Sequence, residues 1–203
     1  MYKFFFKRLL DFSLSITLLI CIFPFFFLLI IILTLIYKGT PFFVQKRPGK
    51  NEKIFSIIKL KTMNDKKGVD GALLPDVQRL TPVGKFIRKT SLDEIPQLVN
   101  VLKGDMSFIG PRPLLIKYLP FYSDSETLRH SIRPGITGLA QVSGRNLLGW
   151  NERLAKDIEY VHNVSLKQDV QIVFKTIKNV ISSKDIVIDP RSLLKDLDDE
   201  RRN

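Results

Sequence analysis

One uninterrupted apolar run dominates the hydrophobic pattern of the chain. From Phe12 to Ile36 there are 25 consecutive residues without a charge. As a helix rising about 1.5 Å per residue, this run is long enough to cross a bilayer core of about 30 Å. It is too long for the apolar region of a signal peptide, and no small-residue cleavage site follows it. We therefore expect a retained membrane anchor.

A proline and the flanking charges bear on the topology of this anchor. Pro24 lacks the N–H group of a helical residue and its ring crowds the preceding turn, so it predicts a kink. Basic residues flank both ends of the run: Lys3, Lys7 and Arg8 before it, and Lys38, Lys46, Arg47, Lys50 and Lys53 after it. This distribution does not favour opposite sides of the membrane. A re-entrant hairpin and a kinked spanning helix both remain open on these residues alone.

The pattern after the anchor predicts a mostly helical α/β fold. Residues 41 to 63 contain two apolar runs around the turn residues 48 to 51, which indicates a β-hairpin or strand pair. Residues 64 to 81 are polar and predict an exposed loop. A helix is expected from Val83 to Lys89 and another from near Ser91 to Gly104. The glycines between 133 and 144 predict tight turns or close backbone approach.

Two amphipathic helices are expected in the last third of the chain. Their apolar stripes are Trp150, Leu154, Ile158 and Val161, then Val170, Val173, Phe174, Ile177 and Ile181. We interpret both stripes as core, with a position on the bilayer surface as the alternative because an anchor precedes them. The expected organisation is an anchor at 1–38, a catalytic domain at 39–188 and a charged tail at 189–203 that frays.

Composition favours an anionic partner without identifying it. The 203 residues include 32 basic and 20 acidic side chains, giving a formal charge of +12. Nucleic acid, phospholipid headgroups and nucleotide diphosphates all fit this balance. The lone Cys21 excludes a disulfide framework and is compatible with the cytoplasm.

The candidate chemistry begins with two adjacent carboxylates, Asp93 and Glu94. Ser91 and Glu94 match the S-x-x-E capping box, which would explain both without catalysis but leaves Asp93 unexplained. A helix starting at Asp93 would place Pro96 within its tolerated first turn. The positive end of that helix should lower the pKa of Asp93 and keep it ionised. An ionised carboxylate can attack phosphorus or hold a divalent cation.

Arginines strengthen the case for phosphate chemistry. Arg112 lies between two prolines, and Arg88, Arg133 and Arg145 flank the acidic pair and the glycine-rich segment. Guanidinium groups match phosphate oxygens bidentately. Each arginine alone is more often a solvated surface charge, but together with the acidic pair and the anchor they indicate phosphoryl transfer at a membrane surface. One helical face can bring together Lys7, Arg8 and Asp11. They would form either a solvated surface ion pair or a contact with an anionic lipid phosphate.

These motifs resemble the small monotopic phosphoglycosyl transferases of the bacterial sugar transferase family. The resemblance runs over nearly the whole chain, through KRLLD, QKRPG, KLKTM, SLDEIPQLVNVLKGDMSFIGPRPL and RPGITGLAQVSGRN. It implies transfer of a sugar 1-phosphate from a UDP-sugar to undecaprenyl phosphate with release of UMP, as the first membrane step of glycoconjugate synthesis. It also implies a re-entrant anchor and surface amphipathic helices at the cytoplasmic face of a bacterial inner membrane.

The resemblance further assigns roles by position. Asp93 would be the nucleophile of a covalent intermediate and the protein ligand of Mg²⁺. Glu94 would assist proton removal or support the metal. Phosphates and nucleotide would be bound by Lys59, Arg88, Arg112 and Arg145, and Lys7, Arg8 and Asp11 would lie near the lipid phosphate. The family commonly has serine before the proline of the bend, whereas Phe23 precedes Pro24 here; the bend would depend on Pro24 or another polar side chain.

Two other functions compete with this interpretation. A membrane-anchored basic module could bind lipid or nucleic acid without chemistry, but it gives no reason for the acidic pair beside GPRP, and basic residues are not interleaved with aromatic residues as nucleic acid would favour. Direct transfer in a ternary complex, with Asp93 only a metal ligand, is not separated from the covalent route. The single apolar segment leads us to expect the minimal catalytic form, and the sequence indicates no oligomeric state.

Overall fold

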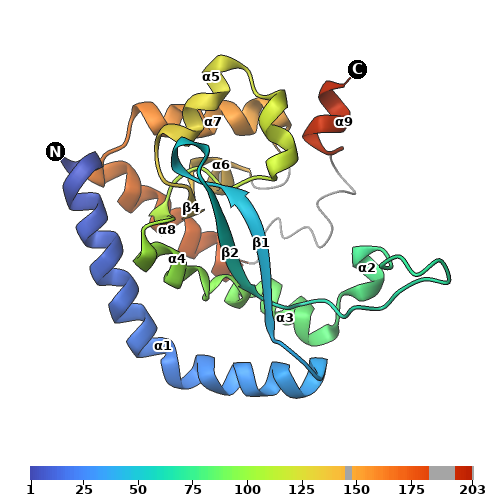
Figure 1. Cartoon of the computed structure of the whole chain (residues 1–203). Helices are drawn as coiled ribbons and strands as arrows, with labels where there is room; N and C mark the ends of the chain where they lie inside the picture. Colours follow the sequence, from blue (N-terminus) through green and yellow to red (C-terminus); the bar gives the residue numbers. More distant parts are fainter. Residues whose placement is uncertain (145–147, 183–194, 203) are drawn as a thin grey trace.

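The computed structural model describes residues 1–144, 148–182 and 195–202. Its helices outweigh two small sheets, which confirms the mostly helical fold class (Figure 1). In chain order the elements are η1 (Tyr2–Phe6), α1 (Lys7–Tyr37), β1 (Phe42–Pro48), η2 (Lys50–Glu52), β2 (Ile54–Leu60), α2 (Asp76–Arg79), α3 (Pro82–Lys89), η3 (Leu92–Glu94), α4 (Gln97–Lys103), β3 (Ser107–Ile109), η4 (Ile116–Phe121), α5 (Asp124–Thr127), η5 (Leu128–Ser131), β4 (Gly135–Thr137), α6 (Leu139–Ser143), α7 (Trp150–His162), α8 (Leu166–Ser182) and α9 (Leu197–Arg201).

The apolar run forms α1, which changes direction sharply near its middle (Figure 1). Pro24 lies inside this helix. The hydroxyl groups of Ser15, Thr17 and Thr34 bond back to the helix backbone away from the turn before Pro24, so the proline is the helix breaker available at the bend. Most apolar side chains of α1 face outward, with Phe25 76% exposed. Such a surface needs an apolar surrounding, as a membrane anchor does.

The predicted hairpin is confirmed. β1 and β2 are antiparallel, with Phe42 opposite Leu60 and Pro48 opposite Ile54. Phe55 and Ile57 lie on one face of β2 and pack against core residues of α4 and its C-terminal loop. Lys59 shares their strand parity and therefore points from the same face. The hairpin thus directs one lysine toward the interior side of the molecule.

The helix expected from Ser91 to Gly104 is two shorter pieces, whereas α3 forms as predicted. η3 holds the acidic pair in a single turn, and Pro96 then serves as the N-cap residue of α4. Gly104, with φ of 90°, ends α4 in the left-handed conformation that glycine tolerates. The break places Asp93 and Glu94 on a tight turn rather than on a helical face.

The glycine-rich segment makes the predicted close backbone approach. β4 pairs in parallel with β3, aligning Ser107 with Gly135 and Ile109 with Thr137. A Cβ atom at Gly135 would lie 2.1 Å from the backbone nitrogen of Gly110, so only glycine fits there. This contact joins the GPRP loop to the segment that begins at Arg133.

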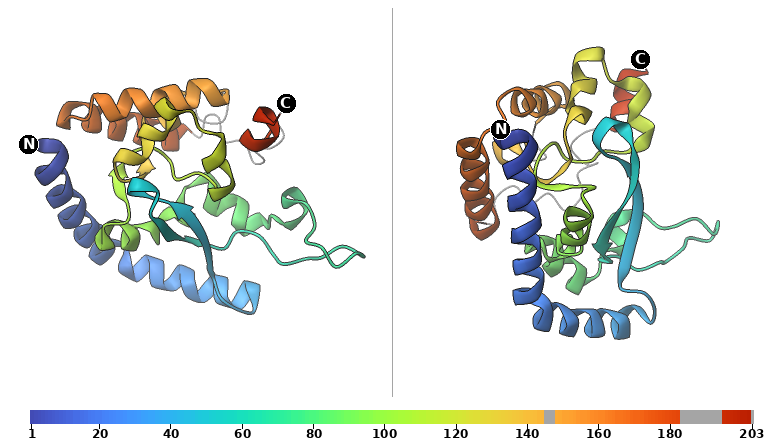
Figure 2. Two further views of the ribbon diagram at one scale, coloured as in Figure 1. Left: turned by 45° about the horizontal axis from the view of Figure 1, so that its top comes forward. Right: turned by 60° about the vertical axis from the view of Figure 1, so that its left-hand side comes forward.

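The two amphipathic helices differ in what they bury. The stripe of α7 is core, since Trp150, Leu154 and Val161 are buried. The core interpretation is wrong for α8, whose stripe lies on the surface, with Phe174 70% exposed. The reason is that α8 packs through Ile172 and Asp169 instead. Figure 2 shows α8 beside the N-terminal half of α1, so two neighbouring helices present apolar faces outward.

The described part of the C-terminal tail is ordered by side-chain contacts. Leu197 is fully buried in a cluster with Trp150 and Leu154. Both terminal nitrogens of Arg201 contact the carboxylate of Glu126, at 2.6 and 2.7 Å. The expectation of fraying is therefore wrong for residues 195–202, and residues 189–194 lie outside the described part.

Candidate active site

A cleft of about 1210 Å³ brings the predicted chemistry together. Its lining includes Lys59, Arg88, Asp93, Glu94 and Arg112, which come from β2, α3, η3 and the GPRP loop. Eleven basic and six acidic side chains line it. The excess of positive charge suits a substrate with several negative charges.

The acidic pair lies against two cations. The Glu94 carboxylate accepts a hydrogen bond from Lys59 Nζ at 2.8 Å and another from Arg112 Nη2 at 3.3 Å. Lys59 Nζ also lies 3.9 Å from Asp93 Oδ2. The capping-box interpretation of Ser91 and Glu94 is wrong, because Ser91 makes no side-chain cap and Glu94 is held by these cations instead. Lys59 thus bridges the two carboxylates.

The two neighbouring carboxyl groups titrate far apart. Burial and then the negative charge of Glu94 raise the pKa of Asp93 to about 6. Burial also acts on Glu94, but Lys59 and Arg112 outweigh it and lower the pKa of Glu94 to about 2. The prediction of a lowered pKa for Asp93 is wrong, because desolvation outweighs the end of a single helical turn.

These values assign different chemistry to the pair. With a pKa of about 6, Asp93 is about nine-tenths ionised at pH 7 and remains a basic, nucleophilic carboxylate. A group with a pKa of about 2 is a weak base, so Glu94 suits positioning of cations or support of a metal better than proton removal.

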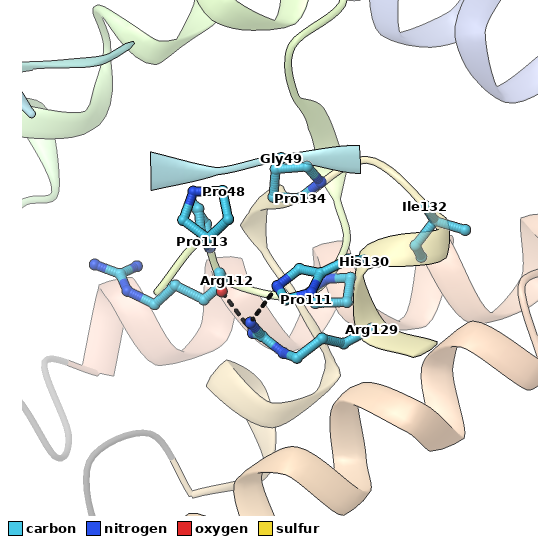
Figure 3. A pocket seen from close by; sticks show the side chains of 9 residues that line it. All are labelled: Pro48, Gly49, Pro111, Arg112, Pro113, Arg129, His130, Ile132 and Pro134. Carbon is cyan, nitrogen blue, oxygen red and sulfur yellow. Dashed lines mark hydrogen bonds between the residues drawn. The ribbon is translucent and has the colours of Figure 1, made fainter. Parts of the chain in front are cut away.

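A buried ion pair holds the loop of Arg112. Arg129 donates to the backbone oxygen of Arg112 at 2.7 Å and to Asp157 Oδ2 at 2.7 and 3.1 Å. Both Arg129 and Asp157 are buried. Figure 3 shows the Arg112 side chain extending away from Arg129, whose guanidinium faces the backbone of the loop. Sequence reasoning missed this pair; the signal was Asp157, a charge within the apolar stripe of α7.

The remaining predicted phosphate ligands have different placements. Arg88 lines the cleft, and its Nε donates to Thr62 Oγ1 at 3.0 Å. Arg145 lies outside the described residues. Arg133 caps the C-terminus of α4, donating from Nε to the backbone oxygen of Gly104 at 2.7 Å. Arg88 is thus available to a ligand in the cleft, whereas Arg133 has a structural contact.

The basic and acidic residues at the start of α1 attach the helix to the domain. Arg8 donates to the backbone oxygens of Val101 and Leu102 at the end of α4, at 2.5 and 2.7 Å. Asp11 Oδ1 accepts from the backbone N–H of Phe108 in β3 at 3.0 Å.

A third contact joins the same end of α1 to α8. Lys7 Nζ lies 2.6 Å from Asp169, which also accepts hydrogen bonds from Tyr2 and Tyr160. The described residues that line the cleft do not include Lys7, Arg8 or Asp11. The structure therefore brings these three residues to the interface between α1 and the domain.

Asp93 and Glu94 can serve a magnesium ion. Mg²⁺ is usually held by one or two carboxylates together with substrate phosphates, which is the donor set that this pair and a bound diphosphate would offer. In the described ranges, three carboxylates close enough to share an ion occur at Asp196, Asp198 and Asp199. Lys117 already pairs with two of these, at 2.8 Å each, so that group is structural.

The acidic pair lies among cations in a cleft, and the same domain carries an exposed apolar helix. This combination is typical of a membrane-associated transferase for phosphate-bearing substrates. Comparison of the sequence with known protein families narrows this class to one family. The chain belongs to the bacterial sugar transferase family, whose model matches residues 2–183.

Curated relatives agree with this assignment. The chain is 45% identical to the uncharacterized sugar transferase EpsL of Bacillus subtilis, over 89% of each chain. It is 37% identical to UDP-glucose:undecaprenyl-phosphate glucose-1-phosphate transferase of Caulobacter vibrioides, over 87% of this chain and 70% of that one. It is 39% identical to undecaprenyl-phosphate galactose phosphotransferase of Salmonella typhimurium, over 87% of this chain but 40% of that longer one.

Proposed function

We propose that the protein transfers a sugar 1-phosphate from a UDP-sugar to undecaprenyl phosphate and releases UMP, as the first membrane step of glycoconjugate synthesis. The observation that carries the proposal is the Asp93–Glu94 pair, held by Lys59 and Arg112 in a strongly basic cleft. The names of the Caulobacter and Salmonella relatives support the same reaction class. A binding module without chemistry would not need a nucleophilic carboxylate at this position.

The proposed reaction has two displacement steps at phosphorus. Asp93 attacks the sugar-bearing phosphorus, the bond to the bridging oxygen breaks, and UMP leaves with that electron pair. A phosphate oxygen of the lipid then attacks the same phosphorus and displaces Asp93, which returns to its ionised form. Lys59, Arg88 and Arg112 stabilise charge on the phosphate oxygens, and Glu94 keeps Lys59 and Arg112 in place. Mg²⁺, when bound at Asp93, would neutralise further phosphate charge.

The acidic pair can be tested with a matched carboxylate. We expect Asp93→Asn to abolish UMP release from a panel of UDP-sugars with undecaprenyl phosphate, while Asp199→Asn, an exposed carboxylate that does not line the cleft, leaves it unchanged. Turnover of Asp93→Asn above about a tenth of wild type, a barrier change below about 1.4 kcal/mol, would contradict both a nucleophilic and an essential metal role. Intact-protein mass spectrometry without acceptor should show a phosphosugar adduct that Asp93→Asn lacks; its absence in wild type would favour the ternary route.

The proposed membrane arrangement is a re-entrant helix with both ends in the cytoplasm of a bacterial inner membrane. The bend in α1, Pro24 within it, and its N-terminal contacts with α4, β3 and α8 support this arrangement. The exposed apolar face of α8 would lie on the same bilayer surface.

Single cysteines can test this topology. In a Cys21→Ser background, Lys3→Cys and Arg202→Cys should both resist a membrane-impermeant thiol reagent in intact spheroplasts and react after permeabilisation. Labelling of Lys3→Cys with protection of Arg202→Cys would mean that α1 spans the membrane.

A further inference from the structure

Two arginines with no role in the reaction as described line the same cleft as Asp93. Arg47 is the penultimate residue of β1, and Arg153 lies in the first turn of α7. Arg47 donates from Nη2 to Gln45 at 2.6 Å, and its buried Nε has no hydrogen-bond partner in the described part of the chain. Arg153 stacks 4.7 Å from the ring centre of Trp150. Contacts within the protein therefore hold both guanidinium groups in place.

The positive charges of these residues lie close to that of Arg112. Burial and then the charge of Arg112 lower the pKa of Arg47 to about 10, and the same two causes lower the pKa of Arg153. Both remain protonated at neutral pH. The neighbouring carboxylate of Asp157 already carries two hydrogen bonds from Arg129. An anion between the three guanidinium groups would relieve their mutual repulsion.

The cleft has two distinct ends. At one end, α3 contributes Lys85, Arg88 and Lys89, and this helix packs against the C-terminal half of α1. The other end is built by Arg47, Arg153 and Arg112, of which Arg112 contacts Glu94 of the acidic pair. Figure 1 shows α3 beside the second half of α1 and α7 on the far side of the domain. The reacting pair thus stands between an end next to the anchor and an end remote from it.

We propose that Arg47 and Arg153 bind the nucleotide phosphate of the UDP-sugar, the one that leaves as part of UMP. This inference rests on the proposed function. When Asp93 bonds to the sugar-bearing phosphorus, the electron pair of the broken bond stays on the bridging oxygen, and the leaving phosphate gains a second negative charge. Arg47 and Arg153 stabilise that charge through bidentate contacts, while the lipid phosphate enters from the α3 end.

UMP binding tests this assignment without requiring turnover. We expect Arg47→Met and Arg153→Met each to weaken UMP binding about tenfold or more in titration calorimetry of the detergent-solubilised protein, since each removes charge-assisted hydrogen bonds. The matched control is Lys46→Met, which removes the same charge from an exposed neighbour in β1 that does not line the cleft. Lys46→Met should bind UMP like wild type.

Half-reactions locate the effect in the reaction. The two variants should form the phosphosugar adduct slowly but transfer a preformed adduct to undecaprenyl phosphate at the wild-type rate. UMP affinity within about twofold of wild type in both variants, or a defect confined to the lipid step, would overturn the assignment. Arg47→Lys, which keeps the charge and the packing, should lose less affinity for UMP than Arg47→Met. It provides the same test if Arg47→Met does not fold. Wild-type protein that neither binds nor releases UMP would instead refute the proposed function itself.

Discussion

Removing Lys59 should move the pH dependence of the reaction in a direction set by the geometry. Its Nζ lies 3.9 Å from Asp93 Oδ2. At that separation the interaction is worth about 1 kcal/mol with the dielectric constant of water and about 4 kcal/mol at an effective value of 20. One pKa unit corresponds to about 1.4 kcal/mol, so Lys59→Met should raise the pKa of Asp93 by about 0.8 to 3 units.

The sign of the effect distinguishes this role from simple phosphate binding. The pKa of Asp93 is about 6 in the wild type, so kcat/KM for the UDP-sugar should fall as pH drops through 6. In Lys59→Met the same acidic limb should begin near pH 7 or above, because the carboxylate now holds its proton longer. Activity at pH 7 is reduced, and part of it returns between pH 8 and 9.

The assay is the initial rate of UMP release at subsaturating UDP-sugar from pH 5 to 9. Lys61→Met is the matched control, since Lys61 also lines the cleft but pairs with Asp65. Its acidic limb should stay near pH 6. If Lys59→Met lowers activity equally at every pH, Lys59 only binds phosphate and the electrostatic account of Asp93 is incorrect.

Three further perturbations follow from the same contacts. Arg112→Lys should lose most of the kcat, because an ammonium group lacks the planar fork; near-normal kinetics would reduce Arg112 to a general charge. Arg129→Met should lower the unfolding free energy by about 3 to 5 kcal/mol in denaturant titration, since it leaves Asp157 buried and unpaired; an unchanged midpoint would contradict this. Because α1 keeps the protein in the membrane, Phe174→Glu should raise amide hydrogen exchange of α8 in liposomes, whereas the exposed polar change Lys175→Glu should not.

Local patterns predicted those parts of the fold that local physics decides. The hairpin followed from two apolar runs around a turn, and α3 and α7 followed from helical periodicity. Periodicity identifies an apolar stripe on a helix but not what packs against it. The sequence therefore does not distinguish the stripes of α7 and α8, although only that of α7 is buried. The packing of α8 depends on Asp169, whose partners Tyr2 and Lys7 are more than 160 residues away in sequence.

In the site as well, the features that depend on residues near in sequence were predicted, and those that depend on residues far apart in sequence were not. The acidic pair and Arg112 were found because they lie in one short segment whose residue types carry chemistry. The capping box failed because Glu94 is held by Lys59, 35 residues earlier, and by Arg112, 18 residues later. The pKa of Asp93 was misjudged for a related reason, since desolvation depends on the packed structure.

In the proposed membrane arrangement, the first turns of α1 set the distance between the acidic pair and the lipid. Arg8 donates hydrogen bonds to α4, the helix that follows the acidic pair, and Asp11 accepts one from β3, the strand that leads to Arg112. An extra residue inserted between Asp11 and Pro24 would rotate the rest of the helix by about 100° and lift it by about 1.5 Å. In the proposed membrane arrangement, α1 therefore sets the depth and orientation of the domain. A generic transmembrane helix of equal hydrophobicity would hold the domain at the membrane without presenting its cleft to the proposed lipid phosphate.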